Sequence, residues 1–222
     1  MRPLPAMIDG QRNVITGFFQ DHHEKEWYLR TSEYLKQRRG FIQRRFVECT
    51  RYVEVHSDNC DTFSYEFAGI LRDCGSVFSS VLDAMIKGSE FSDKEQTNIA
   101  DYKAFLKEQD DRVYLYSVHF RSRFPDGLIL PLYALKGRES PGWWDSYNKV
   151  KHSEYDQYSS GNLGNVATAL ASLVILEVIF GKPSTDEIWT NIGLQYEEGS
   201  FDMNTMKRLF PKSELISESE EP

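Results

Sequence analysis

Cysteine is scarce in this chain, which has only three in 222 residues: Cys49, Cys60 and Cys74. Their spacing matches no zinc or redox motif, and three is an odd number for a disulfide framework. The sequence therefore indicates a reducing compartment. We expect a cytoplasmic protein that carries no metal and no other cofactor.

Basic charge is also in short supply. The chain has 26 Lys and Arg against 34 Asp and Glu, a formal net charge of −8. This balance argues against a protein that coats nucleic acid nonspecifically, which needs a basic surface, but it does not exclude a small basic cleft. Residues 212–222 contain four Glu and one Lys, and we expect them to form an acidic disordered tail.

Long apolar runs are nearly absent. The N-terminal stretch MRPLPAMIDGQRN lacks the apolar run of a signal peptide. Only residues 163–180 approach the hydrophobicity of a membrane span, and four polar residues interrupt them: Asn165, Thr168, Ser172 and Glu177. We therefore predict a buried core helix here and no association with membranes. Without repeats or a low-complexity linker, residues 1–211 are expected to form a single domain.

Helical periodicity dominates what is present. Residues 24–55 are expected to be mostly helical, with a break or kink at Gly40, and residues 61–87 carry a wide apolar stripe. Ser92 and Glu95 have the spacing of a capping box and predict the start of a further helix. The stripes of 61–87 and 162–180 need partners, so we expect these two helices to form the central pair. The predicted fold class is mainly α, an antiparallel helical bundle.

One segment departs from the helical pattern. Residues 112–120 (RVYLYSVHF) and 128–135 (LILPLYAL) are rich in β-branched, aromatic and other apolar residues, and Pro125-Asp126-Gly127 between them indicates a turn. We expect a hairpin-like or irregular insertion near 112–135, within about 108–140, in which Pro131 weakens the second strand. Further on, the pattern suggests a short strand at 188–196 and a small helix at 203–209.

Basic residues concentrate within 30–51, and two interpretations of them remain open. The segment is either a solvated helix face or a phosphate-binding stripe in which Arg44 and Arg45 would bind the ligand. Its basic members are Arg30, Lys36, Arg38, Arg39, Arg44, Arg45 and Arg51.

Residues 142–152 (GWWDSYNKVKH) combine large aromatics with a polar cluster. On a helix, Trp143, Tyr147 and Val150 share an apolar face. A second face carries Trp144, Asn148 and His152, flanked by Asp145 and Lys151. The pattern therefore predicts that Trp143 and Tyr147 are buried, while Trp144 forms an aromatic wall beside the polar groups.

The polar cluster has a plausible chemistry. An imidazole at His152 moves protons near neutral pH, an amide at Asn148 holds a hydroxyl or phosphate oxygen, and Lys151 neutralises phosphate charge. Two alternatives remain open. The groups either line the edge of a cleft or interface, or they form a hydrogen-bonded network sealed inside the bundle.

The stretch PGWWDSYNKVKH (141–152), followed by GNLGNVATALASLVILE (161–177), resembles bacterial proteins of the HEPN (higher eukaryotes and prokaryotes nucleotide-binding) superfamily. These proteins pair a WWxxYNxxKH-like helix with a following apolar helix, after a long amphipathic helix such as 61–87. The resemblance covers about 60–180. It implies an antiparallel helical bundle, and many members are metal-independent endoribonucleases that act as toxins or antiviral effectors.

The family motif carries over only in part. His152 matches the motif histidine and Asn148 the polar residue before it, but the arginine position is occupied by Tyr147. Tyrosine lacks the charged fork that binds phosphate bidentately. Either Lys149, Lys151 or an arginine from 38–51 or 121–123 supplies the charge, or this branch does not cleave RNA.

Two functions follow as expectations. The first is a helical module that binds RNA, a nucleotide or a protein partner from a neighbouring gene, in a bacterial defence or toxin–antitoxin system. The alternative is a metal-independent endoribonuclease that uses His152, Asn148 and Lys151, with Trp144, Asp145, Lys149, Arg44 and Arg45 in binding. The resemblance also implies a homodimer.

Overall fold

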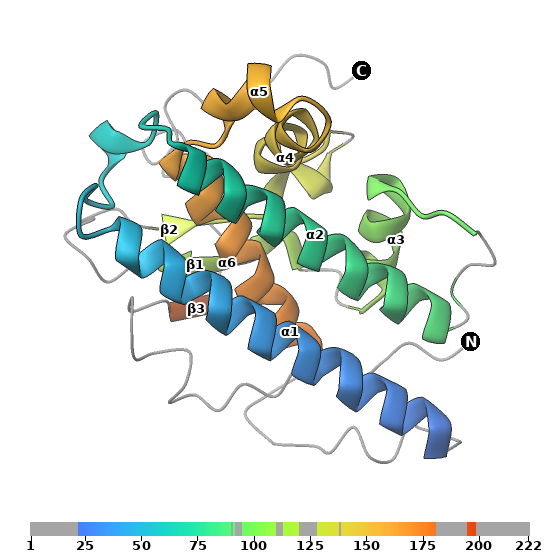
Figure 1. Cartoon of the computed structure of the whole chain (residues 1–222). Helices are drawn as coiled ribbons and strands as arrows, with labels where there is room; N and C mark the ends of the chain where they lie inside the picture. Colours follow the sequence, from blue (N-terminus) through green and yellow to red (C-terminus); the bar gives the residue numbers. More distant parts are fainter. Residues whose placement is uncertain are drawn as a thin grey trace, which may run out of the picture.

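The computed structural model describes residues 22–89, 91, 95–109, 113–119, 128–137, 139–180 and 195–198, and it is mainly helical (Figure 1), as expected from the sequence. The α-helices are α1 (His22–Cys49), α2 (Tyr65–Gly88), α3 (Ile99–Gln109), α4 (Gly142–His152), α5 (Glu154–Gln157) and α6 (Leu163–Phe180). Short 3-10 helices are η2 (Ser57–Asn59), η3 (Val113–Leu115), η4 (Tyr133–Lys136) and η5 (Tyr158–Ser160).

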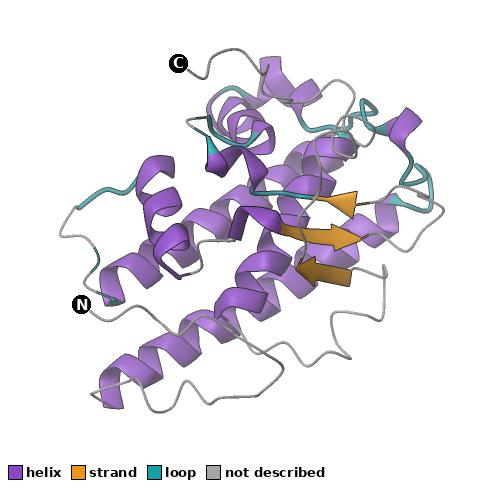
Figure 2. Cartoon of the chain, turned by 180° about the vertical axis from the view of Figure 1, so that it is seen from behind, coloured by secondary structure: helices purple, strands orange, loops and turns teal. Residues whose placement is uncertain are grey.

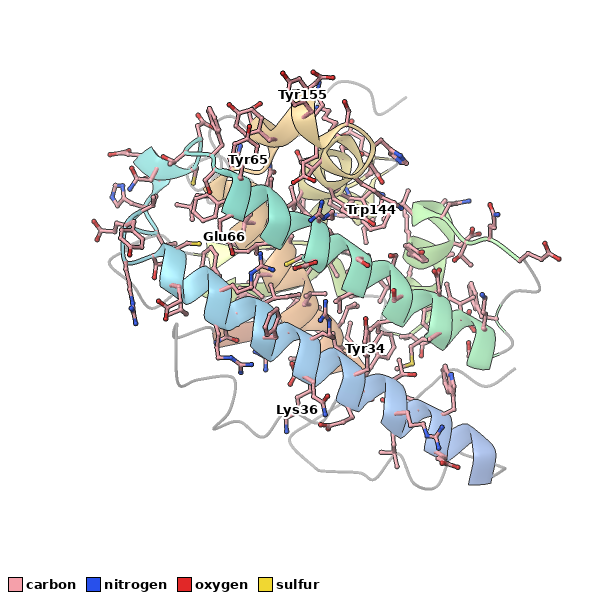
Figure 3. All side chains as sticks on the ribbon, viewed as in Figure 1. Tyr34, Lys36, Tyr65, Glu66, Trp144 and Tyr155 are labelled. Atoms are coloured by element: carbon pink, nitrogen blue, oxygen red, sulfur yellow. The ribbon has the colours of Figure 1, made fainter. Side chains whose placement is uncertain are left out.

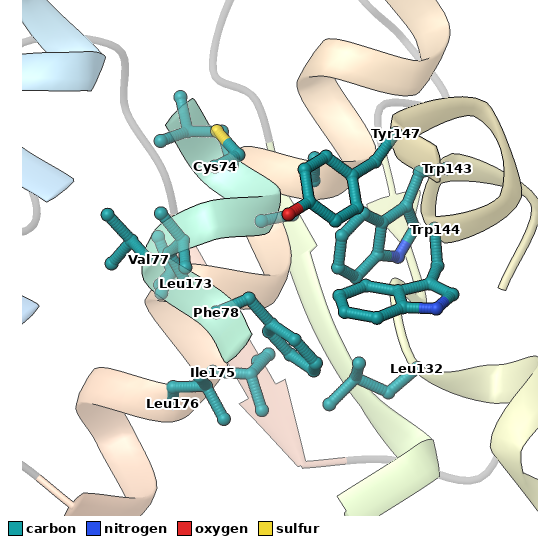
Figure 4. Packing of buried hydrophobic residues seen from close by; sticks show 14 of the residues in the cluster. Cys74, Val77, Phe78, Leu132, Trp143, Trp144, Tyr147, Leu173, Ile175 and Leu176 are labelled. Carbon is teal, nitrogen blue, oxygen red and sulfur yellow. The ribbon is translucent and has the colours of Figure 1, made fainter. Parts of the chain in front are cut away.

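Helix α6 is the centre of the core. It packs against α1, α2, α4 and the first strand, and it is buried along most of its length. By length and composition α6 could cross a membrane, but 78% of that segment is buried inside the protein. The expected pairing with α2 is confirmed. Figure 4 shows side chains of α2 and α6 packed together, among them Cys74, Val77, Phe78, Leu173, Ile175 and Leu176.

Helix α1 runs unbroken through Gly40, so the predicted break there is wrong. An interior glycine costs a helix about 1 kcal/mol relative to alanine. Burial of Leu35, Ile42 and Phe46, each at 0% exposure, outweighs that cost on both sides of Gly40.

A buried ion pair joins α1 to α6. The guanidinium of Arg39 donates to the carboxylate of Glu177 through Nε and, at 3.4 Å, through Nη2, and its Nη1 donates to Gln43 Oε1. Arg39 and Glu177 are only 3% and 2% exposed. Arg39 is therefore one member of the basic segment 30–51 that belongs neither to a solvated face nor to a ligand site.

Helix α3 begins later than the capping-box pattern predicts. Asn98 caps it: its Oδ1 accepts from the Ala100 amide at 2.9 Å, and its own amide donates to Asp101 Oδ2 at 3.0 Å. This reciprocal pair satisfies amides that have no intrahelical partner. The start at Ser92 and Glu95 is corrected to Ile99.

A small antiparallel sheet forms the non-helical part of the fold (Figure 2). Its order is β2-β1-β3, with β1 spanning Tyr116–His119, β2 Leu128–Ile129 and β3 Gln195–Glu198. The hairpin-like pairing near 112–135 is confirmed, with Val118 opposite Ile129. β2 ends before Pro131, which has no amide to donate to a ladder. Of the strand expected at 188–196, residues 195 and 196 belong to β3. Residues 188–194, the expected helix at 203–209 and the tail lie outside the described residues.

Candidate functional site at the α2–α4 junction

One face of α4 is anchored in the core. The Pro141 carbonyl accepts from the Trp144 amide at 2.8 Å and begins the helix. Trp143 is 2% exposed, packs edge-on against Phe78 with ring centroids 5.1 Å apart, and donates from Nε1 to the Pro131 carbonyl at 3.0 Å. Tyr147 is 3% exposed, so the predicted burial of Trp143 and Tyr147 is confirmed.

Trp144 also lies in the core, which corrects its predicted place as a wall beside the polar groups. It is 9% exposed and contacts Phe78, Tyr102, Trp143 and Tyr147, with ring centroids 5.1–5.9 Å apart. Figure 4 shows the rings of Phe78, Trp143 and Tyr147 beside it. The two tryptophans therefore serve one core rather than two faces. The second face of α4 becomes accessible only beyond Trp144, towards the end of the helix.

Helix α4 packs against α2, and three successive contacts follow the two chains in opposite directions. Trp144 meets Phe78, Tyr147 lies on Gly75, and Glu154, just after α4, pairs with Arg72. A methyl group at Gly75 would lie 2.3 Å from ring carbons of Tyr147, so the ring needs glycine there. We call the region beyond the Tyr147–Gly75 contact the α2–α4 junction. It contains Arg72, Asn148, Lys149, Lys151, His152 and Glu154.

The predicted polar residues of α4 are accessible at this junction. His152, Lys149 and Lys151 are exposed, whereas Asn148 is half-buried. The Lys151 ammonium lies 5.5 Å from the centroid of the Tyr147 ring. Within the described ranges, the side chains of Asn148 and His152 make no hydrogen bond to protein. The structure thus has an open imidazole and does not contain the sealed network that was the second alternative.

The other predicted binding residues are not brought to this junction. Asp145 lies at the opposite end of α4, where it accepts from Ser140 Oγ at 2.6 Å. Arg44 and Arg45 belong to α1, which lies across α2 from α4 (Figure 1). Arg45 bonds Glu66 at 2.9 Å and also Asp73, both on α2. Arg121 and Arg123 lie outside the described residues.

Arg72 is the junction residue that sequence reasoning missed. Its Nη1 lies 2.5 Å from Glu154 Oε2, and the two side chains are 48% and 39% exposed. Nothing local in the sequence identifies Arg72, because α2 carries several charges on its solvent side. Only the packing of α2 against α4 brings its guanidinium to the end of α4.

Exposed aromatic rings border the junction. Tyr155 on α5 is 87% exposed, and Tyr65 at the start of α2 is 65% exposed (Figure 3). One face of the Tyr65 ring stacks on Tyr158, with centroids 4.6 Å apart and planes inclined by 16°. Tyr65 precedes Arg72 by two helical turns and so lies on the same side of α2. The rings of Tyr155 and Tyr65 are accessible to a flat ligand.

Burial disfavours reactive thiols in this protein. Burial raises the pKa of Cys49, Cys60 and Cys74 above the ordinary value for a thiol. The thiolate is the nucleophilic form, so a raised pKa makes these cysteines poor candidates for nucleophilic chemistry. The chemistry of the junction therefore rests on its imidazole, amide and cations.

No protein-family model, curated protein or solved structure matches this chain. The resemblance of residues 141–177 to the HEPN superfamily therefore stays a prediction, and function has to be inferred from the junction itself.

Proposed function

We propose that this protein is a helical RNA-binding module whose α2–α4 junction holds the phosphates of the ligand. The supporting observation is the open His152 ring beside exposed Lys149 and Lys151 and a half-buried Asn148 amide. Helix dipoles favour cations in a last turn, which accounts for lysines there without a ligand. The same dipole favours a protonated imidazole at His152, but it gives no reason for the half-buried Asn148 amide, which bonds nothing within the described residues.

Charge and aromatic surface both favour RNA as the ligand. At the junction, Lys149 and Lys151 are exposed, and Arg72 is half-exposed and paired with Glu154. Single-stranded RNA is bound by pairing cations with phosphates and by stacking bases on exposed aromatic rings. The rings of Tyr155 and Tyr65 provide such surfaces. A free nucleotide, or a protein partner from a neighbouring gene, is the competing ligand.

Lys149→Gln with Lys151→Gln should weaken binding of a fluorescein-labelled single-stranded RNA. Each lost phosphate contact should lower the slope of log K against log salt by about 0.7 for single strands. The expected loss of affinity for the double variant is roughly 10-fold at low salt, measured by fluorescence anisotropy.

The matched control is Lys87→Gln with Lys107→Gln. These lysines are exposed and also lie in last turns, of α2 and α3, so the variant has the same change in net charge. Equal losses in both double variants would mean that no particular site binds RNA. Wild-type protein that binds ATP or a protein partner, but no RNA, would replace RNA as the ligand.

The open imidazole also supports a second candidate, a metal-independent endoribonuclease. In that reaction the ribose 2′-oxygen attacks the adjacent phosphorus, and His152 accepts the proton of the hydroxyl. The P–O5′ bond breaks, and a protonated imidazole gives its proton to the leaving oxygen. Asn148 would hold a phosphate oxygen and Lys151 would stabilise the developing charge. This proposal includes a homodimer, since the family resemblance implies paired motifs.

If the junction is catalytic, wild-type protein should cleave RNA in the presence of EDTA, and His152→Ala should remove the activity. General acid–base catalysis contributes about 10²–10⁴-fold, so a loss of at least about 100-fold is expected. Asn148→Ala should also reduce cleavage. Both variants should keep their thermal stability within about 0.5 kcal/mol, because neither side chain bonds any of the residues that the structure describes. Unchanged cleavage by a folded His152→Ala protein would exclude this mechanism.

A further inference from the structure

The junction obtains a guanidinium from α2 that α4 itself lacks. Helix α4 carries Lys149 and Lys151 but no arginine. An ammonium binds phosphate as a point charge, whereas a guanidinium binds two oxygens at once in a fixed plane. Arg72 reaches the end of α4 from α2, where its Nη1 lies 2.5 Å from Glu154 Oε2.

We propose that Arg72 is the phosphate-binding guanidinium of the junction, and that Glu154 positions its side chain and competes with the phosphate for it. This inference rests on the proposed RNA binding and adds to it the residue that recognises the phosphodiester and the residue that tunes its affinity.

The number of Arg72 donors already in use fits a role in phosphate binding. A guanidinium carries five N–H donors, and within the described residues Arg72 uses only Nη1. Its side chain is 48% exposed, so the remaining donors are accessible to a ligand. Arg72 lies one helical turn before Gly75. The Tyr147 ring packs against Gly75 and also contacts the Lys151 ammonium. The two cations therefore border the same contact between helices.

Arg45 shows what an arginine with a purely structural role looks like in this protein. Its Nε bonds Glu66 and its Nη1 bonds Asp73, so two of its nitrogens are occupied by carboxylates of α2. Its side chain is 27% exposed. Arg72 has one carboxylate instead of two and nearly twice the exposure, and it therefore has more free donors for a phosphate.

The test measures anisotropy of a fluorescein-labelled single-stranded RNA with the full chain at several salt concentrations. Arg72→Gln should raise Kd about 10-fold and reduce the salt slope by about 0.7. Arg72→Lys should remain weaker than wild type, because it restores the charge without the fork. Glu154→Gln should lower Kd by roughly 3-fold, because it removes the competing carboxylate.

An ion pair on α1 offers matched controls. Arg30 and Glu26 lie 2.5 Å apart, with side chains 78% and 57% exposed. Arg30→Gln and Glu26→Gln repeat the charge changes of Arg72→Gln and Glu154→Gln on another helix. Both should leave Kd nearly unchanged. Circular dichroism melts establish that each variant is folded.

Three results would overturn the inference, or one part of it, in distinguishable ways. If wild-type protein binds RNA and Arg72→Gln binds as well as Arg30→Gln, the role of Arg72 is wrong while RNA binding stands. If wild-type protein binds no RNA at any salt concentration, both proposals are wrong. Weaker binding by Glu154→Gln would show that Glu154 does not compete with the phosphate.

Discussion

Glu177→Leu should lower the free energy of unfolding by about 3–5 kcal/mol, because it leaves the Arg39 guanidinium buried without a counter-charge. The two side chains lie between α1 and α6, at 3% and 2% exposure. Gln43 also accepts from Arg39, but a neutral amide cannot replace a carboxylate. Urea unfolding followed by circular dichroism gives the measurement.

The double variant Arg39→Met with Glu177→Leu should recover most of that loss. Replacing both partners of a buried pair with apolar groups of similar volume is often neutral or stabilising. Arg51→Gln breaks the exposed pair with Glu48, at 3.0 Å, and should cost less than about 1 kcal/mol. A double variant as unstable as Glu177→Leu would show that the pair itself, rather than an unpaired charge, stabilises the fold.

Trp143→Ala should lower the free energy of unfolding by about 3–5 kcal/mol through the cavity it leaves. The ring packs against Phe78 and Trp144, and its Nε1 donates to the Pro131 carbonyl. The effect should also loosen the segment that contains Pro131, because the indole bond ties that segment to α4. The measurement is urea unfolding followed by far-ultraviolet circular dichroism, since a fluorescence signal would change with the tryptophan itself.

Trp143→Phe separates the two contributions of this side chain. It keeps an aromatic ring but leaves the Pro131 carbonyl without its donor. The lost hydrogen bond should lower the free energy of unfolding by about 1–3 kcal/mol, in addition to the effect of the smaller ring. Tyr155→Ala is the control: Tyr155 is 87% exposed, so a change within about 0.5 kcal/mol is expected. A Trp143→Ala protein as stable as the control would contradict the burial of Trp143.

The helices that form the core could be predicted because burial repeats along them. Phe67, Leu71, Phe78 and Leu82 recur at helical spacing in α2, and each is at most 1% exposed. The effect of Gly40 on the helix could not be predicted in the same way. Its weak helix propensity is a local property, and it is overridden by tertiary packing of α1 against α2 and α6.

The candidate site could be predicted only as far as one helix defines it. Four-residue spacing places Asn148 and His152 on one face of α4 and predicts the burial of Tyr147. It does not reveal which other elements cover that helix. Trp144 is buried because Tyr102 of α3 and Phe78 of α2 cover the second face. Arg72 is distant in the sequence and reaches the junction only through packing of α2 against α4.

The central position of α6 has a consequence during synthesis of the chain. Ribosomes make α1 and α2 before residues 163–180, so the apolar stripes of the nascent helices lack their shared partner until α6 emerges. At about 5–20 residues per second this interval lasts several seconds. Arg39 also lacks its carboxylate throughout, since Glu177 belongs to α6. We therefore expect folding to follow the emergence of α6 from the ribosome. Holdase chaperones should bind ribosome-stalled chains that stop before residue 163 but should release the 222-residue chain once it has left the ribosome.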